Sequence, residues 1–188
     1  FKATRVLGEG GFGQVIEVVK RDTGKLYAMK VMKKVELVDA FAGEDWKSIV
    51  LLEKQLHARM HHPLVVNLAY SFQNTGYLVL VMDACPGGDL SVFALTDERL
   101  NPDQVRFIGQ EVTCVIAYLH SKFILYRDLK PENLLVDANG HVRLIDFGLS
   151  VAGTNEMPTS DELCGTPCYM APEVKAFQDK HPKKHPKK

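Results

Sequence analysis

The 188-residue sequence lacks the features of several specialised classes of protein. No uninterrupted apolar run approaches the roughly 18–20 residues of a membrane-spanning helix, so we expect no membrane span. The chain starts at Phe1 without a basic-then-apolar leader, so nothing in it indicates secretion. Its four cysteines (Cys85, Cys114, Cys164 and Cys168) have no metal-ligand spacing and are too few for a disulfide framework, which predicts free thiols and a cytoplasmic location.

Net charge is also absent, because 23 Lys and Arg balance 23 Asp and Glu. Five of the lysines lie in residues 180–188, and the rest of the chain holds 18 basic and 23 acidic residues, a charge of −5. A nucleic-acid-binding domain would carry its basic residues on the folded part, so no nucleic-acid partner is expected. The tail is interpreted as an incidental unstructured end. A nuclear-localisation or anionic-surface patch is the alternative, which makes the nucleus the alternative location.

Apolar residues make up 46% of the sequence, enough for a hydrophobic core. The first part alternates in the manner of β-strands, interrupted by one amphipathic helix pattern. The expected strands are Phe1–Leu7, Val15–Val19, Leu26–Met32, Leu64–Phe72 and Tyr77–Met82. The helix is expected from about Gly43 to Met60, with one face formed by Trp46, Ile49, Leu52, Leu56 and Met60.

The second part is predicted to be mainly helical. Asn101 as N-cap and Pro102 at the first helical position predict a helix over residues 101–121. Its apolar face is expected to consist of Val105, Ile108, Val112, Val115, Ile116 and Leu119. Asp137-Ala138-Asn139-Gly140 predicts a hairpin turn between Leu134–Val136 and His141–Ile145.

A glycine cluster, Gly8-Glu9-Gly10-Gly11-Phe12-Gly13, lies between the first two expected strands. The residues after it favour a strand rather than a helix, so the cluster is placed at a strand–turn–strand tip. Glycines at such a tip let backbone N–H groups approach phosphate oxygens. A plain glycine-rich hairpin explains this motif equally well.

Lys30 interrupts an apolar strand, where an unpaired charge is costly to bury. Glu53, on the expected helix, is the predicted partner of this lysine. A solvated lysine at a strand end is the alternative, which the apolar neighbours of Lys30 disfavour.

Three further motifs follow in order. They are Tyr126-Arg127-Asp128-Leu129-Lys130-Pro131-Glu132-Asn133, then Asp146-Phe147-Gly148, then Ala171-Pro172-Glu173. Together with the glycine cluster, Lys30 and Glu53, they make the chain resemble a eukaryotic protein kinase from residue 1 to about 175. Lys130, two residues after Asp128, is typical of the serine/threonine type.

The resemblance implies an α+β, bilobal kinase-like fold. Residues 1–82 would form an N-lobe with an antiparallel β-sheet and one main helix, and residues 83–88 a hinge. Residues 89–175 would form an incomplete helical C-lobe with the catalytic loop and activation segment, and residues 176–188 a basic low-complexity tail.

By the same resemblance the chain would transfer the γ-phosphate of ATP to Ser or Thr hydroxyls of a protein substrate. Asp128 would orient the hydroxyl and accept its proton, and Lys130 would contact the γ-phosphate. Lys30, paired with Glu53, would hold the α- and β-phosphates.

The implied cofactors are ATP and Mg²⁺. Asn133 and Asp146 would bind the metal ions, because hard cations prefer carboxylate and amide oxygens. The implied nucleotide contacts are Leu7, Gly8, Gly10, Gly11, Phe12, Gly13, Val15, Ala28, Lys30, Met82, Asp83, Cys85, Asp89, Glu132 and Leu135. Ordinary core packing also explains the apolar members of this set.

Within the kinases the chain is similar to the AGC group. Tyr126 replaces the commoner histidine before Arg-Asp, and Cys164-Gly165-Thr166-Pro167 fits that group's activation segment. Asp89 and Glu132 occupy positions that basophilic members use to bind substrate arginine. A preference for basic sequence contexts is therefore a hypothesis.

Three positions depart from the family pattern. Glu162, preceded by Asp161, stands where a loop phosphothreonine is usual, and we expect it to pair with Arg127 and replace the phosphate. His57 stands where an aliphatic residue is usual, so a pH-sensitive helix position is a hypothesis. Few residues follow Glu173, where the family continues with a large set of helices. Either the chain is a fragment or truncated product, or a partner covers the surface of a marginally stable C-lobe. The alternative function is a catalytically weak nucleotide-binding or interaction module.

Overall fold

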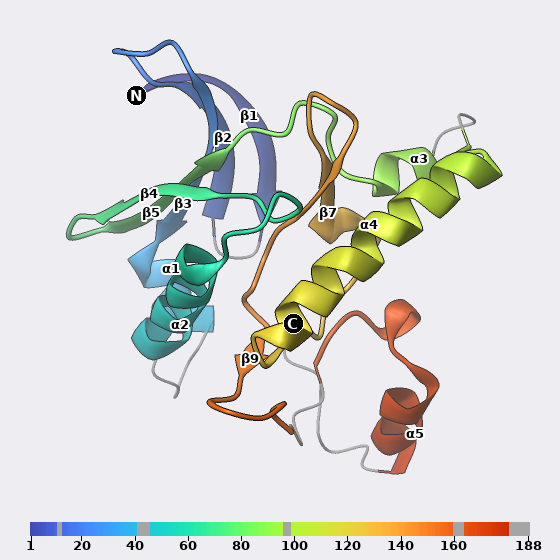
Figure 1. The fold of residues 1–188 in the computed structure, drawn as a ribbon. Coiled ribbons are helices and arrows are strands. Elements are labelled where there is room, and N and C mark those ends of the chain that lie inside the picture. The colour runs from blue at the N-terminus through green and yellow to red at the C-terminus, as the bar shows by residue number, and fades with distance from the viewer. Residues whose placement is uncertain (11–12, 41–45, 96–98, 160–163, 181–188) are drawn as a thin grey trace. The chain divides into compact units, whose positions relative to one another are not determined.

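The computed structural model describes residues 1–10, 13–40, 46–95, 99–159 and 164–180 (Figure 1). The chain divides into two compact units, residues 1–86 (unit 1) and 87–188 (unit 2). The division lies within the expected connector at residues 83–88. Among the helices described, none is both long and apolar enough to cross a membrane. Within the described residues the four cysteines form no disulfide.

Unit 1 is built on an antiparallel five-stranded sheet in the order β1-β2-β3-β5-β4. Its strands are β1 (Lys2–Gly10), β2 (Gly13–Val19), β3 (Leu26–Lys33), β4 (Leu68–Gln73) and β5 (Tyr77–Asp83). The sequence predicted all five, but β4 begins at Leu68 instead of Leu64. Residues 64–66 are apolar and buried, but they lie in a loop. A run of apolar residues alone cannot distinguish such a loop from a buried strand.

The two faces of this sheet bury different clusters, because side chains alternate along each strand. Val18, Tyr27, Val79 and Val81 are buried on one face. On the other, Met32 and Leu80 pack with the helical residues Leu37 and Val50. The second face is the one that carries Lys30, since Lys30 and Met32 are two residues apart on β3.

Two helices cover that second face: α1 (Lys34–Ala40) and α2 (Trp46–Arg59). The sequence did not predict α1, whose seven residues are too few to show a helical period. The expected face of α2 is partly wrong, because Leu52 is 45% exposed whereas Val50, Leu56 and His57 are buried. The side chain of Ile49 lies outside the described part of the chain.

In its described residues unit 2 is mainly helical, with two short two-stranded antiparallel sheets. Its helices are α3 (Ser91–Leu95), α4 (Pro102–Ser121), α5 (Pro172–Lys180) and the 3₁₀ turns η1 (Pro131–Asn133) and η2 (Pro167–Tyr169). Strand β6 (Ile124–Leu125) pairs with β9 (Val151–Ala152), and β7 (Leu134–Val136) pairs with β8 (Val142–Leu144). Residues 176–180, expected in an unstructured tail, continue α5, and residues 181–188 lie outside the description.

Helix α4 begins as the sequence predicted. The Asn101 side chain accepts hydrogen bonds from the backbone N–H groups of Asp103 (3.0 Å) and Gln104 (2.9 Å), and Gln104 Oε1 accepts from the Asn101 N–H (2.8 Å). This reciprocal cap satisfies the first donors of the helix. Val115 and Leu119 are fully buried, but Val105, predicted on the same face, is 54% exposed near the start of the helix.

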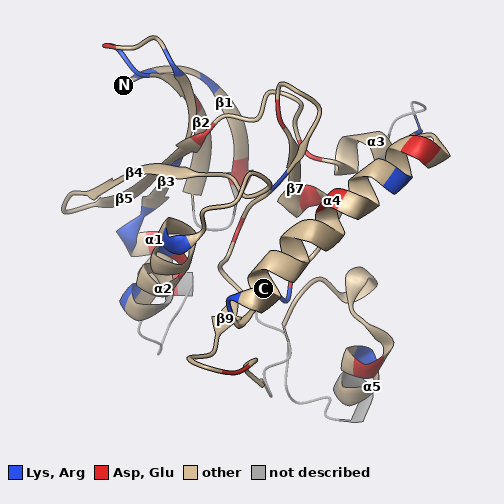
Figure 2. Ribbon diagram, in the orientation of Figure 1, with Lys and Arg blue, Asp and Glu red and all other residues tan. Residues whose placement is uncertain are grey.

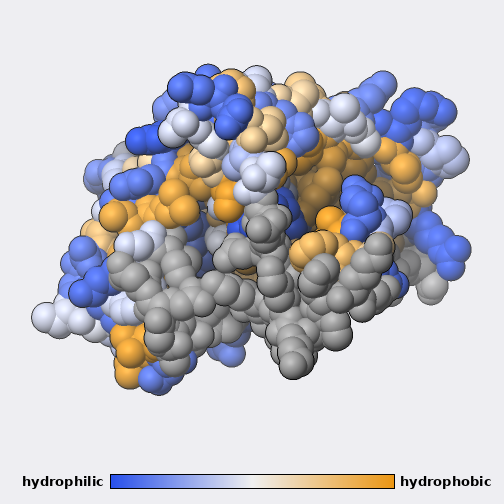
Figure 3. Space-filling model, turned by 90° about the horizontal axis from the view of Figure 1, so that it is seen from below, coloured by the Kyte–Doolittle hydropathy of each residue, from blue (hydrophilic) through white to orange (hydrophobic). Residues whose placement is uncertain are grey.

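Unit 2 also contains an open groove of about 630 Å³ beside α4 and α5, with mainly apolar lining. Tyr169, Val174 and Phe177 line it and are each partly exposed. Hydrophobic side chains at the surface show as orange areas in Figure 3, and acidic and basic residues are distributed over the elements of both units in Figure 2. The partner expected to cover this lobe stays a prediction.

Candidate active site

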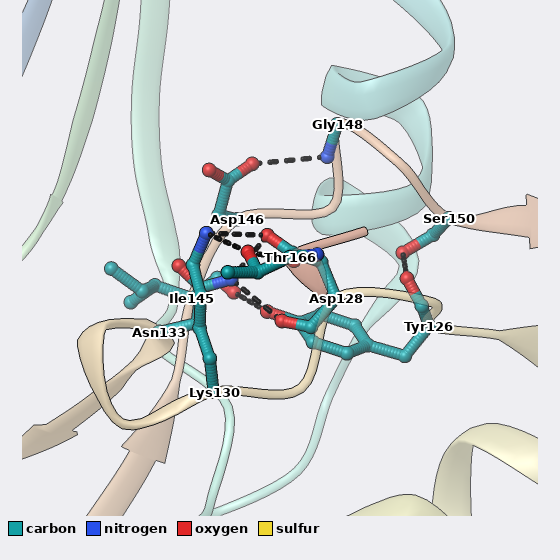
Figure 4. Close-up of polar contacts among 9 residues, drawn as sticks. All are labelled: Tyr126, Asp128, Lys130, Asn133, Ile145, Asp146, Gly148, Ser150 and Thr166. Atoms are coloured by element: carbon teal, nitrogen blue, oxygen red, sulfur yellow. Dashed lines mark hydrogen bonds and ion pairs between the residues drawn. The ribbon is translucent and has the colours of Figure 1, made fainter. Parts of the chain in front are cut away.

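The Asp128 carboxylate is the centre of a polar cluster in unit 2 (Figure 4). Its Oδ1 accepts hydrogen bonds from the Thr166 backbone N–H (3.1 Å) and hydroxyl (2.9 Å). Its Oδ2 lies 2.8 Å from Lys130 Nζ and 3.1 Å from Asn133 Nδ2. Four donors therefore fix the orientation of one carboxylate, which is the arrangement of a preorganised acid or base.

Lys130 connects two members of this cluster. Besides its ion pair with Asp128, its Nζ donates to Thr166 Oγ1 at 3.0 Å. An ammonium group has three N–H donors, so two point at Asp128 and Thr166 and the third can donate to an incoming oxygen.

Thr166 lies in the Cys164-Gly165-Thr166-Pro167 motif, but the resemblance implies no site role for it. It reaches Asp128 because Gly165 adopts φ +103°, where a Cβ atom would lie 2.6 Å from the Arg127 carbonyl oxygen. Only glycine allows this close approach of the backbone. In the sequence, the glycine that directly precedes Thr166 is the feature that could have indicated the contact of Thr166 with Asp128.

Asn133 is the buried member of the cluster. Its Nδ2 donates to the Asp128 carbonyl oxygen (2.8 Å) as well as to Oδ2, so Oδ1 is the end of the amide that can coordinate a cation. Its backbone carbonyl accepts from the Ile145 N–H at 3.0 Å. This bond fixes the segment that carries Asp146 next to the one that carries Asn133.

The segment around Asp146 is held in an unusual conformation. Asp146 (φ 61°) and Arg127 (φ 69°) are two of the three non-glycine residues with positive φ in the described ranges. Such a conformation costs about 1–2 kcal/mol per residue and persists where the surroundings impose it. The Asp146 carboxylate accepts from the Gly148 N–H (3.1 Å), and Tyr126, the residue after β6, donates its hydroxyl to the Ile145 carbonyl oxygen.

Asn133 and Asp146 carry the kinds of oxygen donor that a magnesium ion shared with a nucleotide would need. In the part of the chain that the structure describes, no three His, Cys, Asp or Glu side chains gather as a metal-binding group. The two residues supply carboxylate and amide oxygens but too few for a complete shell. Mg²⁺ usually completes its shell with water and substrate phosphates, so a protein site of this kind suits it.

In unit 1 the predicted ion pair forms, with Lys30 Nζ 3.3 Å from Glu53 Oε1. Lys30 lies opposite Val15 on β2 and Leu80 on β5. Its side chain therefore points to the sheet face covered by α2, where Glu53 is partly buried. The pair orients the lysine within an apolar setting.

The glycine cluster lies at the turn between β1 and β2, as expected. Gly8 pairs with Val15 and Gly10 pairs with Gly13 across this hairpin. Gly13 adopts φ +144°, and a Cβ there would lie 2.0 Å from the Val31 carbonyl oxygen. Residues 11 and 12, predicted as the phosphate-contacting Gly11 and Phe12, lie outside the described residues.

Five of the other predicted nucleotide contacts lie on the strands of unit 1. Leu7 on β1 is exposed, and Val15 is half-buried on β2. Ala28 lies directly opposite Met82 in the β3–β5 register, which places both on the face that carries Lys30. Asp83, at the end of β5, binds the Lys25 ammonium at 2.8 Å, and Cys85 follows it as a half-buried thiol.

The remaining contacts lie in unit 2. Leu135 is on β7 and forms a bridge with Asp89. Asp89 Oδ1 accepts hydrogen bonds from the backbone N–H (2.9 Å) and hydroxyl of Ser91, so part of this carboxylate caps α3. Glu132 is exposed on η1. Partial burial and the charge of Glu132 raise the pKa of Tyr169 above the ordinary value of a phenol.

Two departures from the family pattern have different outcomes. His57 is 4% exposed, and its Nε2 lies 2.5 Å from the Val66 carbonyl oxygen; because a carbonyl only accepts, Nε2 carries a proton. The predicted pair of Glu162 with Arg127 cannot be placed, because Asp161 and Glu162 lie outside the described ranges. The Arg127 Nε donates to the Leu149 carbonyl oxygen at 2.5 Å.

Comparison with known proteins gives a consistent result. The family described as protein kinase domain matches residues 1–185. The chain is 40% identical to a RAC family serine/threonine-protein kinase homolog of Dictyostelium discoideum over 175 residues, 93% of this chain and 38% of that protein. It is 43% identical to a putative ribosomal protein S6 kinase alpha-1 of Caenorhabditis elegans over 177 residues, 93% of this chain and 22% of that protein.

A third relative is the RAC-beta serine/threonine-protein kinase of Rattus norvegicus, 40% identical over 175 residues, 93% of this chain and 35% of that protein. The chain thus spans between about a fifth and two fifths of the length of these relatives. The relatives confirm the resemblance to the AGC group of serine/threonine kinases.

Proposed function

This chain belongs to the protein kinase domain family, and we propose that it transfers the γ-phosphoryl group of ATP to Ser or Thr hydroxyls of protein substrates. The observation that carries the proposal is the cluster of Lys130, Asn133 and Thr166 around Asp128. Phosphoryl transfer depends on positioning and charge neutralisation, and this cluster supplies a fixed carboxylate beside a fixed ammonium.

We assign to Asp128 the role of orienting the acceptor hydroxyl of the substrate. Its oxygens are oriented by four donors, and a substrate hydroxyl donates to the carboxylate by replacing one of them. Lys130 directs its remaining N–H at an oxygen of the transferred phosphate. Lys30, oriented by Glu53, holds the α- and β-phosphates.

The oxygens of Asn133 and Asp146 would hold Mg²⁺. When bound, the ion neutralises the negative charge on the phosphate oxygens. The chain's own contribution is to keep both oxygen donors on two segments joined by the Ile145–Asn133 hydrogen bond.

The proposed substrates have basic residues near the acceptor hydroxyl. Glu132 supports this, because its exposed carboxylate stands on the turn that ends at Asn133, close in sequence to Asp128. Asp89 supports it less, since one of its oxygens caps α3. A degenerate peptide array tests the preference: we expect selection for Arg or Lys that weakens in Glu132→Gln, and selection for acidic flanks would contradict it.

The transfer itself is tested by incubating the 188-residue chain with Mg·ATP and a basic protein, followed by phosphoamino-acid analysis. We expect phosphoserine or phosphothreonine, lost in Asp146→Asn. Stabilisation by Mg·ATP without turnover would instead assign the chain the alternative function, a nucleotide-binding or interaction module. Absence of both would overturn nucleotide chemistry altogether.

A further inference from the structure

We propose that Glu111, on α4, is a positioning residue that fixes the two candidate metal ligands, Asn133 and Asp146, by anchoring the β7–β8 hairpin. The inference rests on the proposed function for the role of those two ligands. The anchoring itself is a property of unit 2 that is measurable without any ligand.

The anchor consists of both oxygens of one carboxylate. Glu111 Oε2 accepts a hydrogen bond from the Val142 backbone N–H at 2.8 Å, and Oε1 lies 2.6 Å from His141 Nδ1. The Glu111 side chain is only 12% exposed. A charged acceptor in partly buried surroundings makes strong hydrogen bonds. Loss of the Glu111 carboxylate would leave the N–H of the buried residue Val142 without its acceptor, which is costly.

A ring contact supports the same attachment. The Phe107 and His141 rings have centroids 5.8 Å apart at an interplanar angle of 42°. Phe107 and Glu111 are four residues apart on α4 and so lie on one side of the helix. The start of β8 is therefore held by two consecutive turns of α4.

The hairpin transmits this position to the candidate ligands. Strand β8 begins at Val142 and ends at Leu144, which pairs with Leu134, the residue after Asn133. The next residue, Ile145, donates its N–H to the Asn133 carbonyl oxygen. Asp146 follows directly, so a shift of β8 moves both ligands.

The hairpin turn closes without help from Glu111. Asp137 Oδ1 accepts hydrogen bonds from the backbone N–H groups of Asn139 (2.8 Å) and His141 (3.1 Å). Its Oδ2 accepts from Arg143 Nε (2.9 Å) and Nη2 (2.7 Å). Loss of Glu111 is therefore expected to release the hairpin from α4 as an intact piece. The consequence is displaced ligands rather than an unfolded hairpin.

The test compares Glu111→Ala, Glu111→Gln and Gln110→Ala in the 188-residue chain. Gln can still accept from the Val142 N–H, and Gln110 is an exposed neighbour on the same helix. Two quantities are measured: amide hydrogen exchange at Val142 and Ile145 without ligand, and the Mg²⁺ concentration that half-saturates ADP binding in calorimetry.

We expect faster exchange at both amides in Glu111→Ala and a rise in the half-saturating Mg²⁺ concentration of about tenfold, with Glu111→Gln and Gln110→Ala close to the parent. Glu111→Ala values equal to those of Gln110→Ala would overturn the inference. If Glu111→Ala does not fold by circular dichroism, Glu111→Asp decides in the same way, because its carboxylate is one methylene too short for both contacts. A parent that binds no Mg·ADP would refute the proposed function, and hydrogen exchange would still decide whether Glu111 anchors the hairpin.

Discussion

Asp128 has its two carboxylate oxygens in different surroundings. Oδ1 receives both hydrogen bonds from Thr166, whereas Oδ2 receives those from Lys130 and Asn133. Each oxygen accepts two hydrogen bonds, so the lone pairs of the carboxylate are all engaged and a substrate hydroxyl replaces one of these donors. The orientation of the carboxylate depends on Thr166 as much as on the charged partner. Thr166 therefore belongs to the machinery that the resemblance assigned to other residues.

Thr166→Ala removes the hydroxyl that links Lys130 to Asp128. Hydrogen bonds to charged groups contribute about 1.5–3 kcal/mol, so we expect kcat to fall by about 10–100-fold. Thr166→Ser is the matched control, because it keeps the hydroxyl and should retain most of the activity. Steady-state kinetics decide, and a parental kcat in Thr166→Ala would show that the contact is incidental.

The residues of the site differ in how far the sequence could predict them. Lys30 and Glu53 could be paired because a charge on an apolar strand requires a partner, and a local pattern reveals that need. The contact of Thr166 with Asp128 joins residues 38 apart and depends on the backbone conformation of Gly165. No local pattern encodes such an approach, so the structure was needed to find it.

At the scale of the elements, the capped start of α4 was predictable and the buried face of α2 was not. A cap is a local arrangement of Asn101, Pro102 and Gln104, whereas the face that α2 buries depends on where α1 and the sheet lie. His57 shows the difference, because a polar residue faces the core next to Leu56 while Leu52 faces outward.

His57→Leu is expected to destabilise unit 1 although leucine is apolar. The substitution leaves the buried Val66 carbonyl without the donor that Nε2 provides, which costs about 1–3 kcal/mol. His57→Gln is the control, because its amide can still donate. Thermal unfolding measures the effect, and a His57→Leu chain as stable as the parent would contradict this role. Identical pH profiles of activity in parent and His57→Leu would also end the idea of a pH-sensitive helix position.

Asp137 makes the stability of the β7–β8 hairpin depend on pH. Burial raises the pKa of Asp137, but hydrogen bonds from Arg143 and from the Asn139 and His141 N–H groups lower it more, so the folded-state pKa lies below 3.8. A carboxyl group with a lowered pKa stabilises the fold above its unfolded pKa, near pH 4. That stabilisation is lost as the pH falls through the folded value.

Asp137→Asn is therefore expected to lower the free energy of unfolding by about 1.5–3 kcal/mol at pH 7. Denaturant titrations from pH 7 to pH 2 should show the parent approaching the variant below about pH 4. Asp103→Asn is the control, because its side chain is 88% exposed and its pair with Arg106 is expected to contribute less than about 1 kcal/mol. A constant difference at all pH values would refute the assignment.

At the scale of the whole molecule, the proposed groups are divided between the two units. Unit 1 supplies the Lys30–Glu53 pair and the glycine turn, and unit 2 supplies Asp128, Asn133 and Asp146. The fold class could be predicted from the order of motifs along the chain. The element boundaries and helix α1 of unit 1 could not, because they depend on packing between distant segments.

The most direct test of the proposed chemistry is a parallel measurement of phosphotransfer rate and Mg·ADP affinity in Asp128→Asn. Asn keeps the size of the side chain but cannot accept the hydroxyl proton, so we expect the rate to fall by about 10²–10⁴-fold. The affinity for Mg·ADP should stay within about twofold of the parent, because Asp128 is assigned to the acceptor hydroxyl and not to the nucleotide. An Asp128→Asn chain that transfers phosphate at the parental rate would contradict the assignment of Asp128.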